Sequence, residues 1–116
     1  MTDGVLWPTR FFVPAPKISL YLLDPSSEEG ASKDRYFRSY GFDASAPEIL
    51  EDALLRYATK TNFIGAERTE HGLKLRFDGP LSAPNGRDAQ VLSVWQVDAG
   101  TQGAARFVTA RPSRRR

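Results

Sequence analysis

Seven basic or hydroxyl side chains in this chain could together bind and cleave a phosphodiester. Three come from the N-terminal half and four from the C-terminal half: Lys17, Lys33 and Arg35, then Arg76, Arg87, Thr109 and Arg111. Metal-free cleavage of RNA requires a base that takes the proton of the 2′-hydroxyl and a cation that stabilises the charge developing on the phosphate. Arginine and lysine supply the cation directly, and a lysine with a pKa lowered by burial can supply the base. The same residues are equally compatible with ordinary surface charges.

The residue types present exclude several other chemistries. The chain has no cysteine and one histidine, His71, which rules out thiolate chemistry, disulfides and multi-histidine metal sites. It also has no P-loop, no Rossmann glycine pattern and no Gly-x-Ser-x-Gly elbow. We expect His71 to face solvent in a hairpin turn, and the acidic residues around Glu48–Asp52 to form a solvated helix face. The sequence therefore predicts neither a metal nor a cofactor.

The positive charge of the chain is concentrated at its C-terminus. The net charge is +2, but four of the 16 basic residues lie in the last six positions, and the remainder has 12 basic and 14 acidic residues. A basic surface covering the whole domain is therefore not expected. We interpret residues 1–112 as a single domain, and residues 113–116 as a basic tail that binds polyanions without belonging to the fold.

The C-terminal half predicts an antiparallel meander. Its four strands are expected at Ile64–Arg68, Leu73–Phe77, Ala89–Val97 and Ala104–Thr109. Lys74 and Arg76 should share the outer face of the second strand, because side chains alternate along a strand. Trp95 should lie in the core. The segment Asp78–Asp88, rich in Gly, Pro and Asn, is expected to be a long loop between the second and third strands.

The N-terminal half predicts short helices that cover this sheet. They are expected at Lys17–Asp24, at Lys33–Tyr40 with Ser32 as N-cap and Gly41 just past the end, and from Pro47 to about Thr59 with Ser45 as N-cap. Arg10–Val13 should form an edge strand or a strap across the core. The predicted fold is α+β, with two or three short N-terminal helices packed on a four-stranded antiparallel sheet. No apolar run reaches transmembrane length and no secretion signal is evident, so we expect a cytoplasmic protein, in its own or a target cell.

Lys33 admits two interpretations. It lies one turn before Phe37, at the margin of a stripe formed by Tyr36, Phe37 and Tyr40. A lysine there can extend its ammonium group to solvent past the apolar stripe, which is the ordinary structural role. Alternatively, it can hold a phosphate near the start of the helix.

Short motifs along nearly the whole chain resemble those of an uncharacterised bacterial domain family. In the first half they are K-x-x-x-Y-L-L at residues 17–23 and G-x-x-K-x-x-x-F at residues 30–37. In the second half they are D-G-P-L at 78–81, P-N-G-R at 84–87, V-W at 94–95 and V-T-A-x-P at 108–112. Such domains are similar to the barnase/EndoU/colicin/RelE-like toxin ribonucleases. This chain departs from the pattern at Asp34-Arg35, where a small residue usually follows the lysine.

The resemblance implies a metal-independent endoribonuclease toxin that cleaves RNA, with tRNA as one candidate, through attack of the 2′-hydroxyl. Lys33, Lys17 and Thr109 would be the catalytic residues. The substrate-binding residues would be Arg87, Arg111, Arg35 and Arg76. RNA would be one partner, and an immunity protein or antitoxin another. The alternative is a non-catalytic module of a toxin–immunity or phage-related system that binds a protein partner, since related folds also include inactive members.

Overall fold

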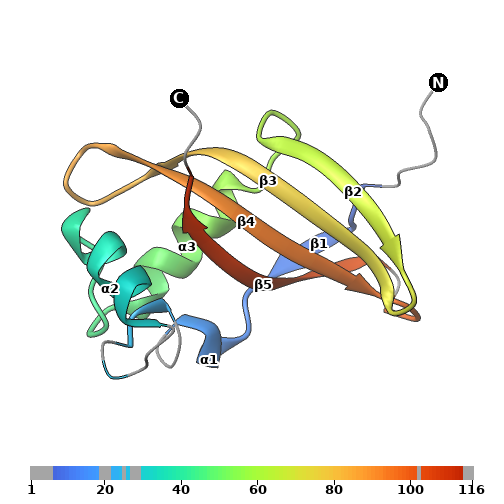
Figure 1. Cartoon of the computed structure of the whole chain (residues 1–116), viewed down its shortest axis with the longest axis horizontal. Helices are drawn as coiled ribbons and strands as arrows, with labels where there is room; N and C mark the ends of the chain where they lie inside the picture. Colours follow the sequence, from blue (N-terminus) through green and yellow to red (C-terminus); the bar gives the residue numbers. More distant parts are fainter. Residues whose placement is uncertain (1–6, 19–21, 25, 27–29, 102, 114–116) are drawn as a thin grey trace.

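A long, twisted sheet of five strands carries the fold, with the helices gathered on one side of it (Figure 1). The computed structural model describes residues 7–18, 22–24, 26, 30–101 and 103–113. The strands are β1 (Arg10–Phe12), β2 (Phe63–Thr69), β3 (Gly72–Ser82), β4 (Asp88–Asp98) and β5 (Ala104–Pro112). The helices are α1 (Ala15–Lys17), α2 (Gly30–Ser39) and α3 (Pro47–Tyr57). The predicted α+β class is confirmed.

The sheet is mixed rather than purely antiparallel. Its strand order is β1-β5-β4-β3-β2. The four predicted strands pair antiparallel, but β1 adds a fifth, parallel to β5 through pairing with Ala104–Arg106. The prediction of a four-stranded antiparallel sheet was therefore wrong in this detail. The prolines on either side of Arg10–Phe12 indicate that this segment is extended. They do not specify which strand it pairs with, or whether the pairing is parallel or antiparallel.

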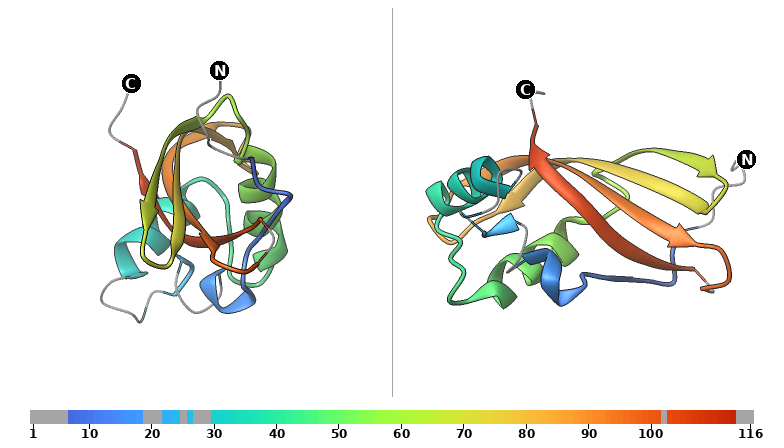
Figure 2. Two further views of the ribbon diagram at one scale, coloured as in Figure 1. Left: turned by 90° about the vertical axis from the view of Figure 1, so that its right-hand side faces the viewer. Right: turned by 60° about the horizontal axis from the view of Figure 1, so that its bottom comes forward.

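The segment expected to be a long loop is largely strand. β3 continues through Asp78, Gly79 and Pro80 to Ser82, and only residues 83–87 connect it to β4. Pairing between β3 and β2 ends at Phe77 and Phe63, so β3 is an edge strand at Pro80, where a missing N–H does no harm. A Cβ on Gly79 would lie 2.1 Å from Asn62 Oδ1, so glycine there lets the Asn62 side chain pack against the strand. Figure 2 shows β3 and β4 running together along the length of the sheet.

The helices begin at different residues from those predicted. Ser32 lies inside α2, which starts at Gly30, and α3 has Ala46 rather than Ser45 at its N-cap, with no side-chain capping bond. α3 ends at Tyr57 instead of Thr59. α1 is only three residues long, and residues 19–21 of the helix expected at 17–24 lie outside the described residues.

Gly41 terminates α2 as predicted, although the helix ends at Ser39 rather than Tyr40. Gly41, with φ of 100°, follows the helix in the left-handed conformation. The N–H of Phe42 bonds to the carbonyl of Phe37, and that of Gly41 to Arg38, which is the hydrogen-bond pattern of a Schellman motif.

The core lies between the helices and the facing side of the sheet. Trp95 is completely buried, as predicted, with its ring centroid 5.2 Å from that of Phe107 and 5.3 Å from that of Phe11. The indole N–H donates to Ser93 Oγ at 2.9 Å, and Ser93 donates to the Tyr57 hydroxyl at 3.1 Å. Tyr57 in turn donates to the carbonyl of Val91 at 2.8 Å. This chain of bonds satisfies the polar groups of the core, as burial requires.

Candidate functional site

The side of the sheet that faces away from the core carries two neighbouring rows of residues across β3, β4 and β5. One row is Arg76, Val94 and Thr109, and the next is Asp78, Leu92 and Arg111. Buried residues alternate with these along β3 and β4, as expected for a sheet with one covered face. Each row therefore joins polar or charged groups of β3 and β5 across an apolar residue of β4.

α2 brings Lys33 to this face. β1 pairs with β5 only as far as Arg106, and α2 packs against β5. From the helix, Lys33 Nζ donates a hydrogen bond of 2.9 Å to Thr109 Oγ1, in a half-buried position. Two residues 76 positions apart in the sequence, both predicted as catalytic, therefore meet at one point.

A pocket of about 490 Å³ lies in the row next to that of Thr109, on the same face of the sheet. Its lining residues are Asp78, Leu92, Arg111, Pro112 and Ser113. Thr109 precedes Arg111 by two positions on β5, so the two side chains share a face about 7 Å apart. We call the pocket and the Lys33–Thr109 contact together the outer-face site.

A ridge of aromatic rings on α2 continues from Lys33 toward the β3–β4 loop. Tyr36 and Tyr40 follow Lys33 at helical spacing, and their ring centroids are 5.3 Å apart. The Arg87 guanidinium lies 5.8 Å from the centroid of the Tyr40 ring. Burial, reinforced by the neighbouring Tyr40, raises the pKa of Tyr36 to about 12, so Tyr36 keeps the proton that it donates to the Gln90 carbonyl at 2.8 Å.

The β3–β4 loop is docked on the end of α2, which fixes Arg87. The N–H of Asn85 donates to the carbonyl of Tyr40 at 3.2 Å, and the Asn85 side chain accepts a bond from the N–H of Arg87 at 2.9 Å. A Cβ on Gly41 would lie 3.1 Å from that of Pro84, so the glycine permits this close approach. The tight turn predicted at Asn85-Gly86 therefore places Arg87 beside the aromatic ridge.

Of the three remaining predicted site residues, Arg76 lies on the sheet face that carries the outer-face site, and Lys17 and Arg35 lie on helices. Arg76 is in the Thr109 row and forms a salt bridge of 3.1 Å with Glu67 on β2. Lys17 is the last residue of α1 and is half-buried. Arg35 is exposed, and its two-residue separation from Lys33 on α2 directs the two side chains to different sides of the helix.

The sequence-based site omitted Asp78 and Ser113. Ser113 Oγ donates to Asp78 Oδ1 at 2.7 Å, across the intervening β4. The alternation that placed Lys74 and Arg76 on one face extends to Asp78, but the prediction began the loop at Asp78 because Gly79-Pro80 follows. Had the strand been continued, Asp78 would have been predicted on the same face.

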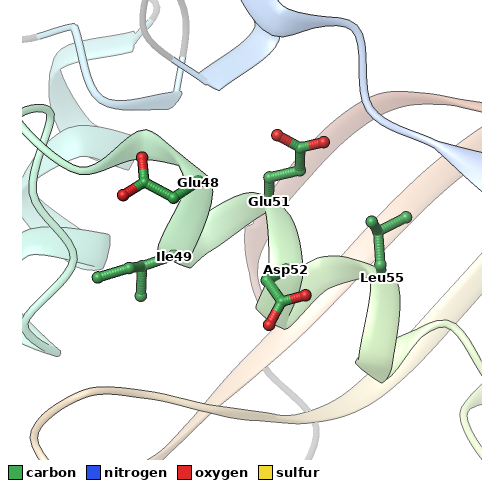
Figure 3. A pocket seen from close by; sticks show the side chains of 5 residues that line it. All are labelled: Glu48, Ile49, Glu51, Asp52 and Leu55. Atoms are coloured by element: carbon green, nitrogen blue, oxygen red, sulfur yellow. The ribbon is translucent and has the colours of Figure 1, made fainter.

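A second pocket, of about 430 Å³, lies on the solvent side of α3 and has a different character (Figure 3). Its lining residues are Glu48, Ile49, Glu51, Asp52 and Leu55. The three carboxylates come from one helix and do not converge on a point in Figure 3. Among the described residues, no group of three or more metal-ligating side chains is present. An acidic surface repels phosphate, so RNA is not expected here.

Comparison with known proteins identifies the family. A model of the DUF6883 domain family, whose function is unknown, matches residues 8–114. The chain belongs to this family. No curated protein matches the chain.

The fold of this DUF6883 domain recurs in a solved structure, the complex of a contact-dependent growth inhibition toxin with its immunity protein from Klebsiella pneumoniae 342. A chain of that complex superposes with a TM-score of 0.70 and 15% sequence identity, over 88% of this chain and 92% of that one. At this identity the likeness establishes a shared fold. No helix within the described part of the DUF6883 domain is long and apolar enough to cross a membrane.

Proposed function

We propose that this domain is the toxin of a growth-inhibition system and acts as a metal-independent endoribonuclease. The observation that carries the proposal is the 2.9 Å hydrogen bond between Lys33 Nζ and Thr109 Oγ1, beside a pocket lined by Arg111. An ammonium group, a hydroxyl and a guanidinium are the groups that bind a phosphodiester and stabilise the charge that develops on it. The fold shared with a chain of a toxin–immunity complex supports the proposed toxin role.

In this proposal RNA crosses the outer-face site as a single strand. Lys33 and Thr109 would contact oxygens of the scissile phosphate, and Lys17, at the end of α1, would supply a second cation. Arg111 and Arg76 would hold phosphates along β5 and β3. Arg87 would hold a phosphate beside Tyr40, while the exposed Arg35 would contribute to long-range attraction. Unpaired bases stack readily on aromatic rings such as those of Tyr36 and Tyr40, and tRNA, with its single-stranded loops, is a candidate substrate.

The direct test is incubation of the purified chain with total RNA and with tRNA, with and without EDTA. We expect cleavage to products with 2′,3′-cyclic phosphate ends, unaffected by EDTA. Expression in bacteria should inhibit growth unless a protein inhibitor is co-expressed. Intact RNA after prolonged incubation with folded protein would refute the ribonuclease proposal.

A second candidate is a non-catalytic module that binds a protein partner, such as an immunity protein or antitoxin. It is favoured by the pocket on α3, where Ile49 is 46% exposed among carboxylates. A module of this kind would bind an inhibitor or a toxin while leaving RNA intact, so the cleavage assay also separates the two candidates.

A further inference from the structure

We infer that Asp78 is the general base of the proposed ribonuclease, an inference that rests on the proposed function. The carboxylate lies in the pocket that also contains Arg111, on the same face of the sheet as Thr109. Its hydrogen bond from Ser113 spans β4, so the Asp78 side chain leans from β3 toward β5. The bond holds the carboxylate on the pocket side of the sheet, in the row that ends at Arg111 on β5.

Asp78 and Arg111 line one pocket without forming an ion pair. Within the described part of the chain, every ion pair involves other residues. A pocket of about 490 Å³ lined by one carboxylate and one guanidinium that form no ion pair suits a group that contacts both. A ribonucleotide does so, because its phosphate suits the guanidinium and its 2′-hydroxyl suits the carboxylate.

Several other carboxylates of the described residues are held in salt bridges. Asp34 pairs with Arg38 at 3.0 Å, Asp98 with Arg106 at 3.1 Å, and Glu67 with Arg76 at 3.1 Å. The hydrogen-bond partner of Asp78 is instead a hydroxyl, that of Ser113. Asp78 is also the only carboxylate among the described residues that line this pocket.

Lys33 is better suited to the cationic role. Its Nζ donates a hydrogen bond to Thr109 Oγ1, and an ammonium group, which has only donors, is suited to that contact. With a carboxylate on the outer face of the sheet, the two roles are divided, and the lysine stabilises charge while the aspartate accepts the proton.

The proposed reaction moves one proton onto Asp78 and one onto the leaving 5′-oxygen. The Asp78 carboxylate takes the proton of the 2′-hydroxyl as the 2′-oxygen forms a bond to phosphorus. The bond from phosphorus to the 5′-oxygen breaks, and that oxygen takes a proton from water. The products are a 2′,3′-cyclic phosphate and a 5′-hydroxyl, and Asp78 returns its proton to solvent, which replaces the proton that the water gave up. No oxidant, reductant or further reactant is required.

The test compares wild type with Asp78→Asn, which keeps the size of the side chain and an acceptor for Ser113. Single-turnover cleavage of tRNA should fall about a hundredfold or more, as expected for loss of a general base. The affinity for the same RNA carrying 2′-O-methyl groups, which cannot be cleaved, should stay within about threefold. Ser113→Ala is the matched control, because it removes the hydrogen bond but keeps the carboxylate, and it should lose less than about tenfold in rate.

Chemical rescue separates a base from a structural residue. Cleavage by Asp78→Ala should increase with added imidazole or formate, because a small base can enter the vacated space, and cleavage by Lys33→Ala should not respond in this way. Asp78→Asn that cleaves tRNA within threefold of wild type would overturn the inference, as would an Asp78→Ala variant that melts like wild type and is not rescued. If wild type itself leaves RNA intact, the proposed function fails, and Asp78 loses its role with it.

Discussion

Lys33 combines the position of an ordinary partly buried lysine with a specific polar contact. It is half-buried at the margin of the aromatic stripe on α2, as a lysine that reaches past apolar neighbours would be. Its ammonium group nevertheless ends on a specific hydroxyl, Thr109 Oγ1, at a strand edge. In the proposed function, a lysine held by a hydrogen bond on the face that also carries Arg111 would be ordered before RNA binds, which reduces the entropy that binding must remove.

Replacing Lys33 by alanine should separate stability from activity. The free energy of unfolding should change by less than about 1 kcal/mol, as for most partly exposed positions. Cleavage of RNA should fall about a hundredfold or more, because the charge on the phosphate loses its stabilising cation. Thermal melts and single-turnover assays measure the two quantities, and Lys60→Ala, an exposed lysine outside the site, is the control.

The partner Thr109 provides an independent check on that result. Thr109→Val keeps the shape of the side chain and removes the oxygen, and the double variant with Lys33→Ala should cleave hardly more slowly than Lys33→Ala alone, because contacting residues are not additive. Full additivity of the two losses would show that the residues act separately and that the 2.9 Å contact has no role in cleavage.

Among the elements, β3 accounts for most of the difference between the candidate residues predicted from the sequence and those that the structure brings together. Alternation was read correctly from Leu73 to Phe77, and stopping there was reasonable because Gly79-Pro80 usually interrupts a strand. The strand continues because Asn62 supplies its backbone carbonyl to the N–H of Asp78 at 2.8 Å, and its side chain lies against Gly79. These are tertiary contacts, and local sequence patterns cannot indicate them.

The same limit applies to the site as a whole. The sequence identified Lys33, Thr109, Arg87 and Arg111 as candidates by residue type and motif. Their grouping depends on the register between β4 and β5, which includes an irregularity between Val94 and Trp95. An extra residue at that point sets which side chains of β5 share a face with Leu92, so the grouping required the structure.

Gly79→Ala tests the packing that continues β3. Its Cβ would lie 2.1 Å from Asn62 Oδ1, a distance that forces the side chain or strand to move. We expect a loss of about 1–3 kcal/mol, the usual cost of overpacking. Gly65→Ala is the matched control, since a Cβ there meets nothing within 4 Å. Equal denaturation midpoints for the two variants would show that Asn62 moves aside freely.

At the scale of the whole molecule, stability should fall at alkaline pH. The raised pKa of Tyr36, about 12 against 10.0 for an unperturbed phenol, means that the native state keeps a proton that the unfolded chain loses first. The free energy of unfolding is therefore unaffected below about pH 10 and decreases as the pH rises from 10 toward 12. Burial also raises the pKa of Tyr57, which adds to the decrease.

Denaturant unfolding between pH 8 and 11.5 measures this effect, and Tyr36→Phe should make the decrease shallower because the titrating group is gone. A steeper decrease in the variant would mean that Tyr36 ionises more easily in the native state than in the unfolded chain, the reverse of the expected sign.

The arginines that follow the last strand should bind RNA without contributing to the stability of the fold. β5 ends at Pro112, and Ser113 still bonds to Gln90 and Asp78, so the fold extends to Ser113 at the rim of the outer-face site. Arg114, Arg115 and Arg116 follow directly in the sequence. Removing these three should leave the thermal midpoint unchanged. It should also flatten the salt dependence of binding to 2′-O-methyl RNA, because each contact with a single strand contributes a slope of about −0.7. Three contacts correspond to a change of about 2 in the slope of log K against log salt concentration.

The control is Arg68→Ser, which removes an exposed arginine on β2 and should leave the slope nearly as it is. An unchanged slope after the deletion would mean that the tail does not touch RNA, and that attraction comes from the arginines of the sheet alone.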